Sequence, residues 1–183
     1  MLTKRVGGFR SATHCCVVAS VLTLALGGCK TGPPPPPKII PFDLTVERSP
    51  ELATETIEVD IIGADESLKK ALESVAIKDY FEPEGLVRKD ALREGKTLLF
   101  PAGEAGAKPQ VLPQNDPVWG EWSSRKARYL VIITNLRVES GASYDPRREI
   151  APISLKAYDP AVRKEKRVEI KLLPSRIVIS PHV

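Results

Sequence analysis

The chain has few of the side chains that most often carry out catalysis or bind metals. Its 183 residues include only three cysteines, two histidines and one methionine, and aromatic residues make up 5%. Cys15, Cys16 and His14 lie in a basic and apolar N-terminal segment, so loss of that segment would leave Cys29 and His182. One histidine and one cysteine argue against a Ser/His or Cys/His catalytic pair, an internal disulfide and a histidine-rich zinc site.

The sequence motifs of several enzyme classes are also missing. There is no GxSxG, P-loop, HExxH or GxGxxG after an apolar strand. Residues 1–28 contain Lys4, Arg5, Arg10 and no acid, so their removal would leave 24 basic against 23 acidic residues. Such a balance argues against nucleic-acid binding through bulk charge. We predict that the protein is not an enzyme and binds no cofactor or metal, with a carboxylate-pair hydrolase as the alternative.

The N-terminal segment has the order of a bacterial lipoprotein signal. Its basic start is followed by an apolar run of about a dozen residues, 15–26, which is shorter than the roughly 20 residues of a membrane span. The stretch Leu26-Gly27-Gly28-Cys29 then resembles a lipobox. The pattern predicts a signal peptide over residues 1–28 and acyl chains such as palmitate on Cys29, which would anchor the protein to a membrane. The alternative is an ordinary secretory signal with a chance cysteine.

A proline-rich tether, residues 29–41, follows that cysteine. The run Pro33–Pro37 favours an extended polyproline II helix, which would hold the following domain about 35 Å from the bilayer. A ligand for an SH3-type reader is the alternative for this run. Lys30 stands where an aspartate would retain a lipoprotein in the inner membrane. The sequence therefore predicts an outer-membrane location, with a domain over residues 42–183 facing the periplasm.

Short apolar runs predict that this domain consists mainly of β-strands. The run Tyr129–Ile133 is apolar throughout, as in a central strand covered on both faces, and Pro152 indicates an edge strand. Glu58 and Asp60 alternate with apolar residues, so we expect them to be exposed, solubilising charges. Seven strands separated by turn signals predict a β-sandwich. They are 42–47, 57–62, 97–100, 129–133, one strand within 150–158, and a hairpin of 168–172 and 177–179.

Three segments between the strands predict a small helical insertion. A segment capped by Asp65 or Ser67 ends before Pro83, and a second segment covers Leu86–Leu92. A third begins at Asp116-Pro117, where the acid can cap the first turn and proline suits it.

The third helical segment contains both tryptophans of the chain. Trp119 and Trp122 are three residues apart and so share one face of a helix. We expect them to pack in the core, with a stacking platform for sugar rings as the alternative. The basic stretch 125–128 that follows is expected to be a solvated helix end, and a partner-binding patch is its alternative.

The order of these parts resembles the TssJ family, the outer-membrane lipoproteins of type VI secretion systems. The resemblance rests on the lipobox, the tether, a first strand over 42–48, a loop over 49–55, a second strand over 57–62 and a helical stretch over 67–81. It implies a mainly β, transthyretin-like two-sheet β-sandwich with a small helical insertion. It also implies a structural adaptor in an envelope-spanning secretion complex.

In that family the first loop contacts the periplasmic domain of TssM, an inner-membrane core-complex protein. The resemblance therefore implies a TssM-like partner for this loop, with Leu52 as an anchor. A lipoprotein that binds glycan or another envelope protein, unrelated to secretion, is the alternative. The implied partner-binding residues are Ser49, Pro50, Glu51, Leu52, Ala53, Thr54 and Glu55.

Overall fold

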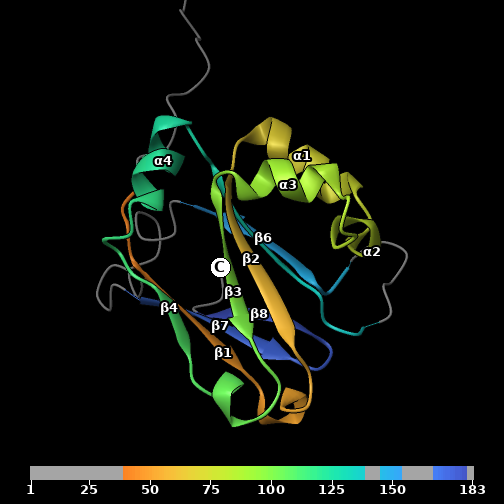
Figure 1. Cartoon of the computed structure of the whole chain (residues 1–183). Coiled ribbons are helices and arrows are strands. Elements are labelled where there is room, and N and C mark those ends of the chain that lie inside the picture. Colours follow the sequence, from red (N-terminus) through yellow and green to blue (C-terminus); the bar gives the residue numbers. More distant parts are fainter. Residues whose placement is uncertain (1–38, 139–144, 154–166, 181–183) are drawn as a thin grey trace, which may run out of the picture. The chain divides into compact units, whose positions relative to one another are not determined.

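Two four-stranded sheets form the body of the protein in a computed structural model that describes residues 39–138, 145–153 and 167–180 (Figure 1). The first sheet has the order β4-β1-β7-β8, and the second has the order β3-β2-β5-β6. All neighbouring strands are antiparallel except β1 and β7, which are parallel. The strands are β1 (Asp43–Arg48), β2 (Ile57–Ala64), β3 (Gly95–Phe100), β4 (Gln110–Leu112), β5 (Tyr129–Thr134), β6 (Arg148–Pro152), β7 (Arg167–Leu173) and β8 (Arg176–Ser180).

The main core lies between the two sheets. Successive side chains of a strand point to opposite faces, so Leu44 and Val46 of β1 meet Val59 and Ile61 of β2 in one apolar cluster. These four side chains are fully buried. The predicted hairpin of β7 and β8 is confirmed and supplies the same cluster with alternate residues.

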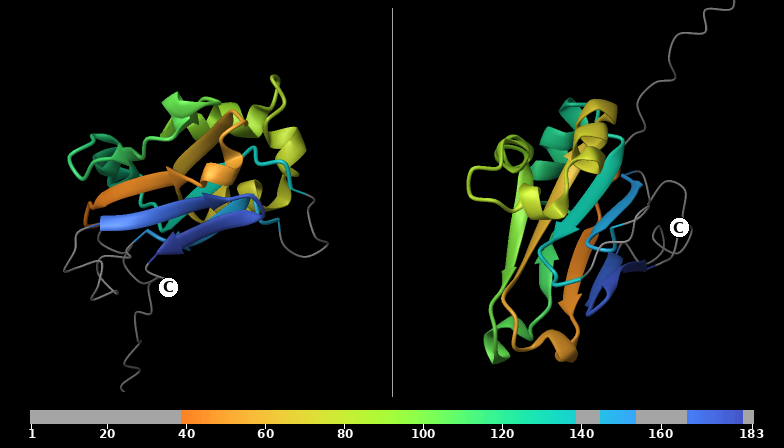
Figure 2. Two further views of the ribbon diagram at one scale, coloured as in Figure 1. Left: turned by 90° about the horizontal axis from the view of Figure 1, so that it is seen from below. Right: turned by 90° about the vertical axis from the view of Figure 1, so that its right-hand side faces the viewer.

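Three helices cover the other face of the second sheet (Figure 2, left). They are α1 (Glu66–Ser74), α2 (Ile77–Tyr80) and α3 (Leu86–Leu92). Val131 and Ile133 of β5 pack beneath them, whereas Leu130 and Ile132 face the main core. This double burial confirms the prediction of a central strand from an uninterrupted apolar run. Pro152 ends β6, which is an edge strand as predicted.

Helix α4 (Val118–Ser124) closes one side of the main core with its two tryptophans. Trp119 and Trp122 are at most 2% exposed, and each indole N–H donates to a backbone carbonyl, of Pro113 and Glu94 respectively. A side chain at Gly63 would come within 2.3 Å of the Trp122 ring, so the strand needs glycine at this close approach. The prediction of core packing is confirmed, and these tryptophans offer no stacking surface for a sugar.

Two details of the fold differ from the sequence predictions. Strand β4 was not predicted, because it has only three residues and lies between Pro109 and Pro113. The helical stretch expected over 67–81 is divided into α1 and α2, where Val75 has extended backbone. Two nitrogens of the Arg148 guanidinium donate to the Glu73 and Val75 carbonyls, which satisfies acceptors at the end of α1.

The most important difference concerns Asp60, which is completely buried rather than exposed. Alternation placed it correctly on the outer face of the second sheet. That face, however, is covered by α2 and α3, and the sequence pattern of a single strand does not show what packs on its polar side. Glu58, on the same face, is partly exposed.

Several sequence predictions lie outside the described residues. They are the signal segment, Cys29, most of the tether and the part of the strand candidate 150–158 that follows Ile153. Within the described ranges, no helix is both long and apolar enough to cross a membrane.

Candidate functional site

One end of the sandwich is formed by two loops that cross between the sheets side by side (Figure 1). The β1–β2 loop, residues 49–56, leaves the first sheet and contains the 3-10 turn η1 (Pro50–Leu52). The β3–β4 loop, residues 101–109, returns to the first sheet and contains the 3-10 turn η2 (Glu104–Gly106). We call these two loops together the loop end.

Arg48, the last residue of β1, holds the loop end together from inside. Its side chain is 7% exposed. Its Nη1 donates to the carbonyl oxygens of Glu55 at 3.0 Å and Pro101 at 2.8 Å, and its Nη2 donates to that of Gly103 at 2.8 Å. No carboxylate of the described residues lies within ion-pair distance of this guanidinium. The buried cation is therefore stabilised by backbone carbonyls of both loops.

Backbone contacts reinforce this connection. The Gly103 N–H donates to the Ala53 carbonyl at 2.7 Å, and the Ala102 N–H donates to the Thr56 hydroxyl at 3.3 Å. Gly106 is buried against the same centre, and a Cβ there would lie 2.0 Å from the Pro101 carbonyl oxygen and 2.8 Å from Arg48 Nη1. The two loops are thus one packed unit rather than two independent turns.

Replacing Gly106 by alanine should disturb this unit. The added Cβ meets a backbone oxygen that cannot simply rotate away, so we expect Gly106→Ala to destabilise the protein by about 1–3 kcal/mol, the usual range for overpacking. Urea unfolding followed by circular dichroism measures this effect. Gly120→Ala is the matched control, because a Cβ at exposed Gly120 in α4 meets nothing within 4 Å. An unchanged midpoint for Gly106→Ala would contradict the described packing.

The structure places the residues implied as partner-binding at the loop end, with one correction. Pro50, Glu51 and Thr54 are exposed, and Ser49, Ala53 and Glu55 are partly exposed. Leu52, however, is only 3% exposed because it packs into the main core. The expectation that Leu52 is an anchor for a partner is therefore wrong, and its burial instead fixes the 3-10 turn from below.

The loop end has an uneven distribution of charge. Glu51 and Glu104 are exposed and Glu55 is partly exposed, whereas Arg48 points inward. Lys108 is an exposed cation of the same two loops. The outward-facing ionisable groups of these loops are therefore three carboxylates and one ammonium.

A buried polar network lies on the opposite side of the second sheet, under α2 and α3. Asp60 Oδ2 accepts hydrogen bonds from Arg88 Nε at 2.8 Å and Tyr80 Oη at 3.0 Å, and its Oδ1 accepts one from Thr97 Oγ1 at 2.6 Å. Arg88 also pairs with Glu58 and stacks over the Phe81 ring, whose centroid is 4.6 Å from the guanidinium carbon. The network joins the second sheet to α2 and α3. Its residues follow no recognisable spacing along the chain, so the sequence did not predict it.

Tyr80 should make stability depend on alkaline pH. Burial, with the adjacent Asp60 carboxylate adding to it, raises the pKa of the Tyr80 hydroxyl above its ordinary value of 10.0. Above that value the unfolded chain releases this proton while the folded chain keeps it. The free energy of unfolding should therefore fall as pH rises above 10, by up to about 1.4 kcal/mol per pH unit from this group.

Urea titrations between about pH 8 and 11 measure this slope. Tyr80→Phe removes the proton that is released, so its slope should be shallower than that of the wild type. Equal slopes for the two proteins would show that Tyr80 ionises normally in the folded state.

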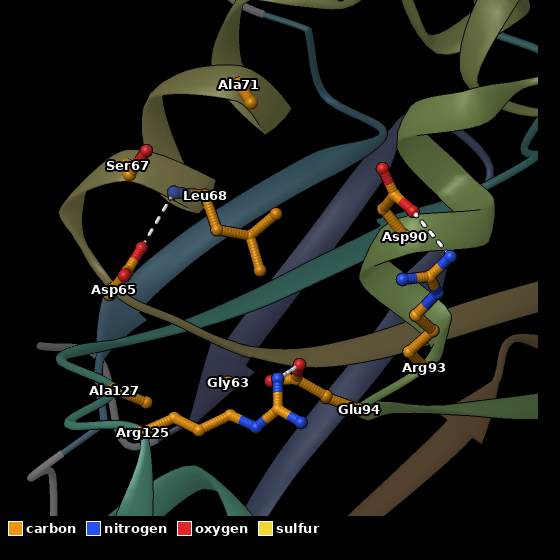
Figure 3. A pocket seen from close by; sticks show the side chains of 10 residues that line it. All are labelled: Gly63, Asp65, Ser67, Leu68, Ala71, Asp90, Arg93, Glu94, Arg125 and Ala127. Carbon is orange, nitrogen blue, oxygen red and sulfur yellow. Dashed lines mark hydrogen bonds and ion pairs between the residues drawn. The ribbon is translucent and has the colours of Figure 1, made fainter.

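A cleft of about 640 Å³ lies where α1, α3 and the end of α4 meet (Figure 3). Its charged groups bind one another: Arg93 pairs with Asp90, and Arg125 pairs with Glu94. Asp65 accepts a hydrogen bond from the Leu68 N–H and so caps α1, as predicted. Paired charges thus line the cleft together with apolar residues such as Leu68 and Ala71, and nothing in its lining resembles a catalytic constellation.

The basic stretch beside this cleft ends α4, as expected from the sequence. Arg125 and Lys126 are exposed, and Lys126 adopts a positive φ of 61°, as residues after a helix often do. Among the described residues, no group of three or more His, Cys, Asp or Glu side chains could hold a metal ion.

The fold and the loop end define a class: a β-sandwich with helices on one sheet and a pair of joined crossover loops at one end. A chain of a structure described as a type VI membrane complex has a similar fold, with a TM-score of 0.50 and 12% identity over 79% of this chain and 100% of that chain. This likeness concerns the fold alone, and it agrees with the two-sheet β-sandwich that the family resemblance implied.

Other solved structures give weaker matches. Serratia marcescens Lip, a membrane-bound component of the type VI secretion system, has a TM-score of 0.46 and 10% identity over 78% of this chain and 99% of its own. The lipoprotein TssJ1 from Pseudomonas aeruginosa has a TM-score of 0.44 and 11% identity over 78% and 98%. Neither a protein-family model nor a curated protein matches the sequence.

Proposed function

We propose that the protein is an outer-membrane lipoprotein that acts as a structural adaptor in a type VI-like secretion complex. Acyl chains on Cys29 hold it in the membrane, and the loop end binds the periplasmic domain of a TssM-like inner-membrane protein. The adaptor makes and breaks no covalent bond. The observation that carries the proposal is the fold shared along the whole length of a chain from a type VI membrane complex.

The geometry of β1 supports this arrangement. The tether enters the domain just before Phe42, at the start of β1, and the loop end begins just after Arg48, at its other end. Six residues of strand separate these points by about 20 Å. A tether that enters at one end of β1 and a contact surface at its other end suit a protein that connects a membrane to a partner.

The absence of other candidate chemistry at the described sites favours binding over catalysis. Asp60, the most deeply buried carboxylate of the second sheet, already accepts three side-chain donors and lies under helices. The two tryptophans that could have bound a glycan are in the core. The loop end remains as a surface with exposed polar groups on a fixed backbone.

Co-purification from cells tests the proposal. The full chain, tagged at its C-terminus and expressed in its own host, is extracted from the envelope with mild detergent and captured. We expect one large inner-membrane protein with a periplasmic domain to be recovered in near-stoichiometric amount. Recovery of peptidoglycan or of unrelated envelope proteins instead would contradict the adaptor role.

A further inference from the structure

We propose that the β3–β4 loop is a second part of the partner-binding surface and that Arg48 is the positioning residue that prepares both loops for a basic patch on the partner. This inference rests on the proposed function. It adds a loop, an organising residue and the chemistry of the partner surface.

The two loops have a common backbone scaffold. The Arg48 guanidinium binds the Glu55 carbonyl of one loop and the Pro101 and Gly103 carbonyls of the other. The Gly103 N–H and the Ala53 carbonyl join them directly. A partner that approaches the β1–β2 loop therefore meets the β3–β4 loop beside it, in a fixed relative position.

Ordering flexible loops during association lowers affinity, and a surface that is already ordered avoids this cost. A planar guanidinium can donate to several acceptors in fixed directions, whereas a lysine ammonium acts as a point charge on a flexible stem. Arg48 is thus suited to fixing both loops before the partner arrives.

Arg48 satisfies carbonyls inside the loop end, so its charge is not presented to a partner. Glu51 and Glu104, one from each loop, are exposed, and no cation of the described residues is within ion-pair distance of either carboxylate. Electrostatic complementarity across an interface determines specificity and the rate of association. A basic patch on the partner's periplasmic domain fits this surface.

Two matched pairs of variants in the full tagged chain test the inference through the recovery of the partner per captured chain. Glu104→Lys reverses a charge in the β3–β4 loop. Glu121→Lys reverses an exposed charge in α4, which lies at a different end of the domain from that loop (Figure 1). We expect at least a tenfold lower recovery for Glu104→Lys and less than a twofold change for Glu121→Lys. Wild-type recovery with Glu104→Lys would overturn the assignment of this loop.

The second pair separates positioning from general stability. Arg48→Lys and Arg88→Lys make the same change at two hydrogen-bonded arginines, the buried Arg48 at the loop end and the partly buried Arg88 in α3. We expect Arg48→Lys to lower recovery at least fivefold, with faster amide hydrogen exchange over residues 101–107. Arg88→Lys should lower the melting temperature but leave recovery within twofold. Equal recovery from the two variants would overturn the positioning role of Arg48.

The outcomes for the two proposals are distinct. If the wild type recovers no inner-membrane protein, the adaptor function itself fails, and this inference fails with it. If the wild type recovers the partner but Glu104→Lys does so equally well, the adaptor function stands and only the second loop is excluded. A photo-crosslinker at position 104 of the otherwise unchanged chain checks this without a charge reversal: it should trap the same partner, and failure to trap it would count against the loop.

Discussion

Replacement of Arg88 by methionine should lower the free energy of unfolding by about 3–5 kcal/mol, the largest stability effect that we expect from a single substitution. Asp60 is completely buried, and Arg88 is its only cationic partner within ion-pair distance among the described residues. Methionine fills much of the same space but leaves the Asp60 carboxylate without a compensating charge. Burying an unpaired charge costs far more than losing an exposed ion pair.

Urea unfolding followed by tryptophan fluorescence measures this loss. Lys89→Met is the control on the same helix, because Lys89 is exposed and its pair with Glu84 lies in solvent, so we expect a change below about 0.5 kcal/mol. The double variant Asp60→Asn/Arg88→Met should recover part of the loss, since it removes the uncompensated charge. A loss below about 1 kcal/mol for Arg88→Met would contradict the importance of this network.

Replacement of Cys29 by serine should leave the protein uncleaved or unacylated and displaced from the outer-membrane fraction. Acyl chains stabilise membrane attachment by about 0.8 kcal/mol per buried CH₂, so their absence removes the proposed outer-membrane anchor. We expect this variant to incorporate no labelled palmitate and to leave the outer-membrane fraction. Cell fractionation on a density gradient, together with the label, measures both effects.

Cys16→Ser is the matched control for this prediction. Cys16 lies upstream of the predicted cleavage position, so its replacement should leave both labelling and fractionation unchanged. If Cys29→Ser is labelled and fractionates like the wild type, the interpretation of residues 26–29 as a lipobox is wrong.

The sequence predicted the individual strands better than it predicted which strands pair and which elements cover the sheets. Strict alternation in Val168, Ile170 and Leu172 and the apolar run 129–133 are local patterns, and the structure confirms both as strands. The pairing of β1 with β7 in parallel depends on residues more than a hundred positions apart, and no local pattern records it. The short strand β4 offers three residues between prolines, too few for a periodic signal.

The same limit explains which parts of the site were missed. Ser49–Glu55 were expected to form a loop from their composition and position, but the inward direction of Leu52 follows from the 3-10 turn and the core below it. Arg48 ends the predicted first strand, and no local pattern marks its role. The carbonyls that it binds, of Pro101 and Gly103, lie more than fifty residues later in the chain.

The central claim is that the loop end binds an inner-membrane partner, and photo-crosslinking in cells from position 51 tests it most directly. Glu51 is exposed at the tip of the β1–β2 loop, unlike the buried Leu52 beside it. A photoreactive residue at 51, with mass spectrometry of the trapped product, should recover a large inner-membrane protein with a periplasmic domain. The same residue at position 121 in α4 should not trap that protein. Recovery of peptidoglycan or unrelated envelope proteins from position 51, or of the partner from position 121 alone, would contradict the account.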